Sequence, residues 1–133
     1  MRRRRPRGFT LYELLIAVVI VGILAGLAIV RYMNLQDKSR QAAATYDLDL
    51  VRKLLAIYAT DYGGYPVAVA SYDDLKSQLV GPDGLSYGRC PPSNTFQWAS
   101  YQLDASQNYV LRVNIVDRQH TVLIATPDRI YRE

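Results

Sequence analysis

Three residues near the start of the chain, Gly8, Phe9 and Glu13, have types and spacing that could take part in chemistry. Glycine lacks a side chain, so its backbone can lie close in a protease cleft, and cleavage after it would leave a free α-amino group on Phe9. Phe9 and Glu13 are four positions apart, which places them on one face of a helix. Glu13 borders the apolar segment Leu14–Val30, where a charge is costly unless it is partnered. It is therefore a candidate functional residue.

The apolar segment Leu14–Val30 has 17 residues, none charged or strongly polar. Its length is at the lower end of the range of about 17–25 residues that a helix needs to cross a bilayer. Ahead of it lie the arginines of Arg2–Arg5 and Arg7, as the positive-inside rule expects on the cytoplasmic side. The formal charge is +4, but without these arginines acidic side chains outnumber basic ones by one. The net charge of the chain without these arginines therefore does not indicate nucleic-acid binding.

Three models of processing are consistent with this start of the chain. A secretory signal could be cleaved after the small residues Gly26-Leu27-Ala28, although Glu13 does not fit between a basic front and an apolar middle. A twin-arginine signal fits less well, because Pro6-Arg7 follows the arginine pair. In the third model, cleavage falls between Gly8 and Phe9 and leaves the apolar segment on the mature protein.

The segment from Gly8 to Leu15, GFTLYELL, resembles the processing motif of type IV pilins and of the pseudopilins of type II secretion, and the likeness extends from Arg7 to Tyr32. The resemblance implies cleavage by a prepilin peptidase after Gly8 and N-methylation of Phe9. It also implies that Glu13 guides assembly by neutralising the Phe9 amine of a neighbouring subunit. From the residues alone, a glutamate that snorkels at the membrane edge remains the alternative.

The resemblance further implies a structural filament subunit that supports motility, adhesion, DNA uptake or protein secretion. Its partners would be other pilin subunits, the prepilin peptidase and methylase, an inner-membrane assembly platform, and membrane lipid before assembly. It would lie in the bacterial inner membrane with a cytoplasmic N-terminus, and later in a periplasmic or cell-surface filament. The residues do not choose between major pilin, minor pilin and pseudopilin.

Two positions depart from the family pattern, because Tyr12 replaces a small aliphatic residue and Val30 stands where many pilins carry proline. Gly22 and Gly26 form a GxxxG spacing, which permits close approach between helices. These two glycines are candidate helix-packing residues.

Beyond Val30 a helical period continues and ends near Gly63-Gly64 and Pro66, which predicts one helix from Thr10 to Tyr62, roughly 80 Å long. We expect an α+β, type IV pilin-like fold in which this helix packs on a small antiparallel sheet of 3–4 strands. The expected parts are a leader (1–8), a membrane-spanning or filament-core segment (9–31), an amphipathic half of the helix (32–62), an irregular segment with a short helix (63–95) and a β-meander (96–133). The apolar stripe of the amphipathic half is predicted to hold Leu35, Ala42, Tyr46, Leu50, Leu54, Ile57 and Tyr58, opposite polar residues that include Asp37 and Gln41.

In the meander, a period of two predicts strands over 96–103, 109–116 and 120–125, with a short edge pairing at Ile130-Tyr131. Before it, Ser71 and the acidic pair Asp73-Asp74 are typical of a capped helix start.

No catalytic, metal-binding or cofactor-binding set is apparent, and we expect no enzyme. The single histidine, His120, is expected at a surface or strand edge, and Asp73-Asp74 are expected to cap rather than to bind metal. Cys90 is the only cysteine, so an unpaired small side chain is favoured over a reactive thiol or an intermolecular bridge. Tyr46, Tyr58, Tyr62 and Tyr65 are expected to pack between helix and sheet. The alternative function is an extracytoplasmic binding domain, membrane-anchored or released by signal peptidase, that does not polymerise.

Overall fold

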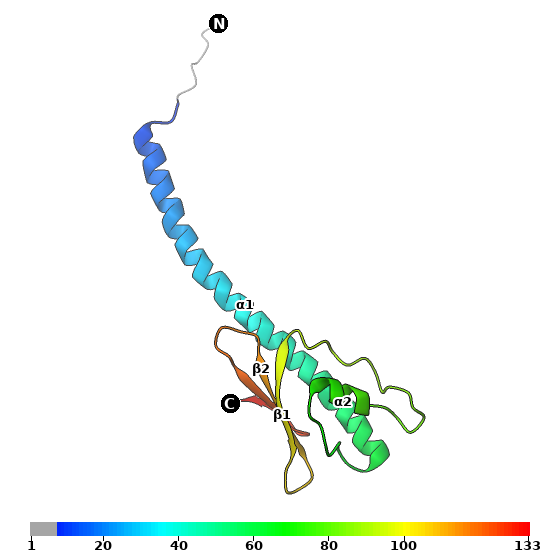
Figure 1. Ribbon diagram of the computed structural model, residues 1–133. Helices are drawn as coiled ribbons and strands as arrows, with labels where there is room; N and C mark the ends of the chain where they lie inside the picture. Colours follow the sequence, from blue (N-terminus) through cyan, green and yellow to red (C-terminus); the bar gives the residue numbers. More distant parts are fainter. Residues whose placement is uncertain (1–7) are drawn as a thin grey trace. The chain divides into compact units, whose positions relative to one another are not determined.

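The computed structural model describes residues 8–133, and the arginines expected in the leader lie outside this range (Figure 1). The chain divides into two units, Met1–Gln36 and Asp37–Glu133, each of which is described by itself. The described elements are the helices α1 (Leu11–Tyr62) and α2 (Tyr72–Gln78) and the strands β1 (Phe96–Leu103), β2 (Tyr109–Ile115), β3 (Val122–Ala125) and β4 (Ile130–Arg132).

The helix α1 has the bounds that the sequence predicts, within one residue. It passes through Val30 without a break, at the position where the family pattern has proline. It ends at Tyr62 because Gly63 takes a positive φ of 73° and donates its N–H to the carbonyl of Ala59 at 2.9 Å. A glycine in this left-handed conformation is a common helix terminator. The predicted α+β class is confirmed.

The four strands form one antiparallel sheet in the order β1-β2-β3-β4, as expected for a meander. The register of β1 against β2 shifts between Trp98 and Ser100. This bulge explains why the apolar positions of β1 step by three residues from Trp98 to Tyr101 instead of by two. The strand β3 begins at Val122, two residues later than predicted, because His120 is exposed and takes a φ of 50°.

The core of the second unit forms where the later part of α1 and the helix α2 meet one face of the sheet. From α1 it holds Leu48, Val51 and Leu55, which are fully buried. The helix α2 adds Tyr72 and Leu75, and the sheet adds Phe96, Tyr109, Leu111, Val113, Ile115, Leu123 and Ala125.

The predicted apolar stripe of α1 is wrong in phase. Leu35 and Tyr46 are 65% and 73% exposed, and of the predicted set only Leu54 is buried in the core. Most buried positions alternate by four and three residues, and Leu54 is buried beside the last of them. The first two of the series carry polar side chains: Asp37, Gln41, Ala44, Leu48, Val51 and Leu55. Because a sequence pattern counts apolar residues, the polar pair at the start of the buried face concealed its phase.

Those two buried polar residues bind the loop between β2 and β3, in what we call the polar clamp: Asp37, Gln41, Asp117, Arg118 and Thr121. The Oδ2 atom of Asp37 accepts a hydrogen bond from Nε of Arg118 and forms an ion pair with its Nη2, each at 2.7 Å. Gln41 Nε2 donates to Asp117 Oδ2 at 2.8 Å, and Thr121 donates to the same carboxylate from its backbone N–H and its hydroxyl. The clamp therefore satisfies the buried polar groups of α1.

Replacing Asp117 with asparagine should lower the free energy of unfolding by about 1–3 kcal/mol, because an amide NH₂ cannot accept the hydrogen bonds that this carboxylate accepts. Burial opposes ionisation of Asp117, but the bonds from Thr121 and Gln41 outweigh it and lower the pKa of this carboxyl to about 2. Its contribution should therefore be present above pH 3.9 or so, the ordinary pKa of aspartate, and be lost as the pH falls toward 2.

Urea unfolding between pH 7 and pH 2 measures this effect, with Asp128→Asn as the control, because Asp128 is an exposed aspartate. An Asp117→Asn variant that retains the full acid dependence of the parent chain would contradict the assignment.

Candidate functional site

The start of α1 is closed by reciprocal hydrogen bonds between Thr10 and Glu13. The backbone N–H and the hydroxyl of Thr10 both donate to Glu13 Oε2 at 2.9 Å. In return, the N–H of Glu13 donates to Thr10 Oγ1 at 3.2 Å. This arrangement is a capping box, in which the side chains at two positions satisfy the free donors of the first helical turn.

This capping box was not predicted, although its Thr-x-x-Glu signature is visible at positions 10–13. Phe9 lies ahead of α1, so the helical relation expected between Phe9 and Glu13 is absent. The side chain of Phe9 is 87% exposed. Both bonds from Thr10 go to Oε2, and no hydrogen bond from residues 8–133 reaches Oε1. One carboxylate oxygen of Glu13 is thus open to a further donor while the cap stays intact.

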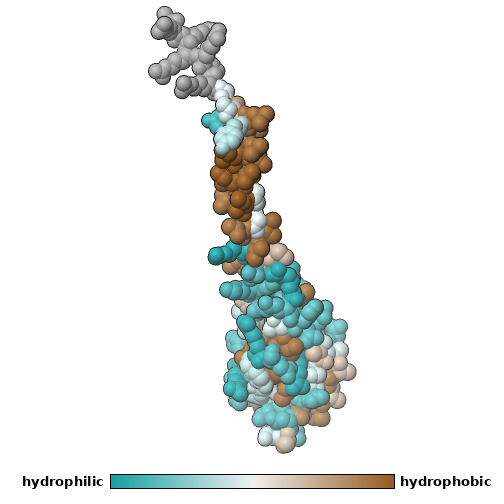
Figure 2. Space-filling view, turned by 90° about the vertical axis from the view of Figure 1, so that its left-hand side faces the viewer, coloured by the Kyte–Doolittle hydropathy of each residue, from teal (hydrophilic) through white to brown (hydrophobic). Residues whose placement is uncertain are grey.

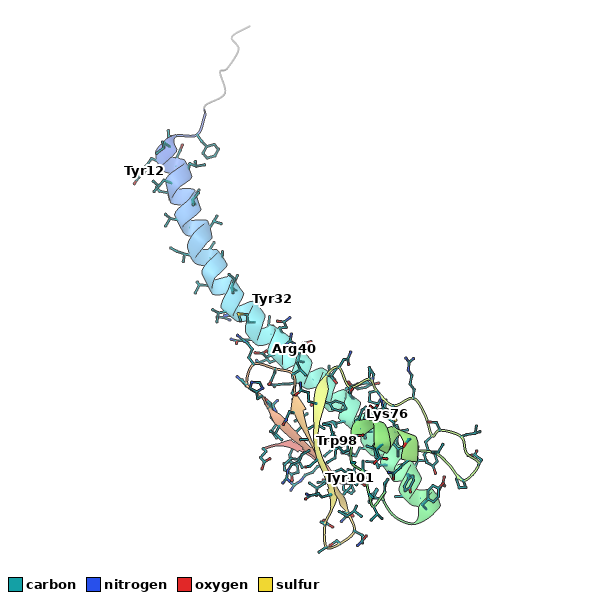
Figure 3. The ribbon with its side chains drawn as sticks, viewed as in Figure 1. Tyr12, Tyr32, Arg40, Lys76, Trp98 and Tyr101 are labelled. Atoms are coloured by element: carbon teal, nitrogen blue, oxygen red, sulfur yellow. The ribbon has the colours of Figure 1, made fainter. Side chains whose placement is uncertain are left out.

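The helix that follows is apolar on every side and exposed. It is long and apolar enough to cross a membrane, and no part of its most apolar stretch is buried in the structure. Figure 2 shows these side chains as a continuous hydrophobic surface, and Figure 3 shows them around the helix between Tyr12 and Tyr32. A Cβ atom added at Gly22 or Gly26 would meet nothing within 4 Å, so both glycines leave open backbone on this surface.

Comparison with known proteins identifies a known motif in this N-terminal segment. The model of the prokaryotic N-terminal methylation motif matches residues 3–29. Type II secretion system core protein G of Aeromonas hydrophila is 34% identical over 88 residues, covering 65% of this chain and 62% of the relative. These findings support the type IV pilin and pseudopilin family for this chain.

Two other relatives are named as components of a type II secretion system and of a type IV pilus. Core protein G of Pseudomonas aeruginosa is 38% identical over 81 residues, covering 61% of the chain and 57% of the relative. The type IV narrow pilus major component PilA5 of Thermus thermophilus is 40% identical over 62 residues, covering 47% and 53%. The matches thus span somewhat more than half of each relative's length. No solved structure matches the chain.

The other residues that the sequence marked as candidates take part in a helix cap, in an ion pair or in packing. Ser71 caps α2 by accepting from the N–H of Asp74, and Asp74 accepts from the N–H of Ala70, as predicted for a helix start. Asp73 forms an ion pair with Lys76. Burial raises the pKa of the Cys90 thiol despite the nearby Lys76, which lowers the thiolate fraction and the reactivity. Within residues 8–133, no group of three or more His, Cys, Asp or Glu side chains could hold a metal ion.

The tyrosines expected between helix and sheet fall into two groups. Tyr65 packs edge-on against Tyr109 with ring centroids 4.8 Å apart, and Tyr58 belongs to the core periphery. Tyr62 is half-exposed and stacks on Tyr58 at 4.5 Å. Tyr46 is exposed on α1, so the packing prediction is wrong for this residue.

Proposed function

We propose that this chain is a structural subunit of a type II secretion pseudopilus or a type IV pilus, assembled through the apolar part of α1. The observation that carries the proposal is a capped helix start at Thr10 and Glu13 that leads directly into a helix with an exposed apolar surface. Such a surface requires lipid or partner helices. After the subunit leaves the lipid, a filament core of parallel helices would supply the partner helices.

Before assembly, the subunit would lie in the inner membrane with its arginine-rich start in the cytoplasm, consistent with the positive-inside rule. The prepilin peptidase would cut between Gly8 and Phe9 and methylate the new amine. The match to the methylation motif over residues 3–29 includes this bond and supports processing there. The assembly platform of the inner membrane would then extract the subunit. We propose no catalytic role for the chain itself.

The open oxygen of Glu13 gives a role to the carboxylate during assembly. An incoming subunit can keep its Thr10 cap on Oε2 and accept the Phe9 amine of a neighbour on Oε1. A charge enclosed among apolar helices without a partner is strongly unfavourable, so only the register that joins the two groups is stable. Gly22 and Gly26 would allow neighbouring helices to approach closely in that register.

The mature N-terminus tests processing. Mass spectrometry of the membrane fraction should find a chain that begins with methylated Phe9. Gly8→Leu should leave the chain uncleaved, because a side chain at the scissile position keeps the backbone out of the protease cleft. Gly22→Leu is the matched control, since Gly22 is also an exposed glycine and should leave cleavage intact.

An intact Met1 in the parent chain, or a start near Ile29, would refute the processing model. The alternative, an anchored binding domain that does not polymerise, predicts a monomer in the membrane fraction and none in sheared filaments.

Similarity to core protein G favours the secretion branch, so loss of the chain should impair protein export more than surface motility.

A further inference from the structure

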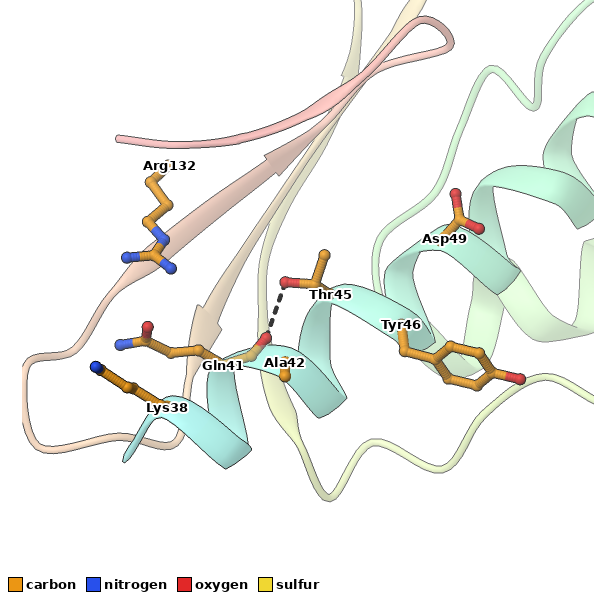
Figure 4. A pocket seen from close by; sticks show the side chains of 7 residues that line it. All are labelled: Lys38, Gln41, Ala42, Thr45, Tyr46, Asp49 and Arg132. Carbon is orange, nitrogen blue, oxygen red and sulfur yellow. Dashed lines mark hydrogen bonds between the residues drawn. The ribbon is translucent and has the colours of Figure 1, made fainter. Parts of the chain in front are cut away.

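A groove in the second unit, which we call the basic groove, lies between α1 and β4. Its volume is about 630 Å³. Figure 4 shows the charged ends of Lys38 and Arg132 on one side of it, near Gln41, with Tyr46 and Asp49 on the other. The lining residues are Lys38, Gln41, Ala42, Thr45, Tyr46, Asp49 and Arg132.

The basic groove has two cationic side chains without a counter-charge. Lys38 and Arg132 are exposed, and neither forms an ion pair within the part of the chain that the structure describes. The one carboxylate of the groove, Asp49, is already paired with Lys53 at 2.8 Å and with Arg52 at 3.8 Å. The groove therefore suits a ligand with carboxylates.

Two carboxylates that form no ion pair with any of residues 8–133, those of Asp61 and Asp83, lie at the other end of this part of α1. Asp61 and Asp83 line one open pocket of about 540 Å³, the acidic pocket, together with Gly81, Pro82, Leu85, Ser86 and Tyr87. Asp61 accepts a hydrogen bond from the hydroxyl of Tyr87 at 2.7 Å, and Asp83 accepts from the N–H of Leu85 at 3.1 Å. These bonds hold both carboxylates in place, and both side chains remain exposed.

The two surfaces cannot meet within one molecule. From Lys38 to Asp61, α1 covers about 35 Å at about 1.5 Å per residue. A surface that binds a different surface on an identical copy makes a heterologous contact, and such contacts generate open helical filaments unless the rotation closes a ring.

We propose that the basic groove of one subunit binds the acidic pocket of another copy of this chain. The contact rests on the proposed function, because it adds a second, domain-level interface to a filament held by the apolar helices. Opposite charges at two fixed positions favour one register over others, and like charges disfavour antiparallel contacts. The charge complementarity of two surfaces on the same chain favours a second copy over an anionic lipid surface as the occupant.

Charge reversal in the full-length chain tests the contact. The groove variant carries Lys38→Glu and Arg132→Glu, and the pocket variant carries Asp61→Lys and Asp83→Lys. Each alone should reduce sheared, pelletable filaments by about tenfold or more, because two attractions become repulsions at every contact. Co-expression of the two variants should restore filaments, since each then offers the surface that the other lacks. The chain with all four substitutions should also assemble by itself.

The controls separate this contact from folding and from the proposed function. Arg89→Glu with Arg129→Glu changes the charge equally outside the groove and should leave filaments normal. If the reversed variants unfold, Lys38→Gln with Arg132→Gln and a rise in salt concentration should weaken assembly in the same direction.

Three results would overturn the contact. The first is normal filaments from both reversed variants. The second is a failure of co-expression to restore assembly of folded variants. The third is loss of binding to phosphatidylglycerol vesicles with filaments unchanged, which would assign the groove to lipid. Absence of filaments from the parent chain would refute the proposed function instead.

Discussion

Glu13→Gln should abolish filament assembly and leave the folded domain unchanged, which is the largest functional effect we expect. Glutamine at the N3 position of a capping box can still reach back to Thr10, so the start of α1 remains closed. It has no negative charge, so it cannot neutralise the amine of a neighbouring Phe9. Filament yield by electron microscopy of sheared material measures the effect, with urea unfolding as the test of folding.

Two variants separate the cap from the charge. Glu13→Ala removes both and should be at least as defective as Glu13→Gln. Thr10→Val removes the hydroxyl that accepts from the N–H of Glu13 but leaves the charge in place, so it should assemble with only a modest loss. If Glu13→Gln forms normal filaments while Thr10→Val fails, the carboxylate acts only as a helix cap and the pairing mechanism is wrong.

Leu48→Ala should give the largest loss of stability, about 2–5 kcal/mol in the free energy of unfolding. Leu48 is fully buried between α1 and the sheet, so its truncation removes apolar contacts and leaves a cavity. Tyr46→Ala, two positions earlier on the same helix, should change this free energy by no more than about 0.5 kcal/mol, because Tyr46 is 73% exposed. Urea unfolding of the full chain in detergent measures both.

This pair of variants tests which side of α1 faces the sheet. The sequence pattern places Tyr46 on the buried side, whereas the structure places Leu48 there. A larger loss of stability from Tyr46→Ala than from Leu48→Ala would show that the helix is rotated from the orientation described above.

The sequence predicted those parts of the fold that local signals determine. Gly63 and Gly64 marked the end of α1, and a period of two located β1, β2 and most of β3. The fourth strand was expected only as a short edge pairing at Ile130-Tyr131. Ser71 and the acidic pair after it predicted the start of α2. Each of these signals depends on neighbours within a few residues, which is why one sequence was sufficient.

Features that depend on long-range partners were not predicted. Asp37 and Gln41 were predicted to face solvent, because their partners Arg118 and Asp117 lie about eighty positions later in the chain. The basic groove likewise joins Lys38 to Arg132, and the bulge at Trp98 depends on the register with β2. At the site, the spacing of Gly8, Phe9 and Glu13 indicated this segment. The prediction considered only the charge of Glu13 and did not include the cap that it forms with Thr10.

The bulge in β1 also has a practical consequence for optical measurements. Trp98 is the single tryptophan of the chain, and there it lies 6.4 Å from the ring of Tyr101 and 6.3 Å from that of Tyr72 on α2 (Figure 3). Its fluorescence, excited at the red edge to avoid the tyrosines, therefore reports on whether α2 is seated on the sheet. No tryptophan lies in residues 1–36, so this emission is confined to the second unit and can follow the domain alone while the apolar helix changes its surroundings from lipid to protein.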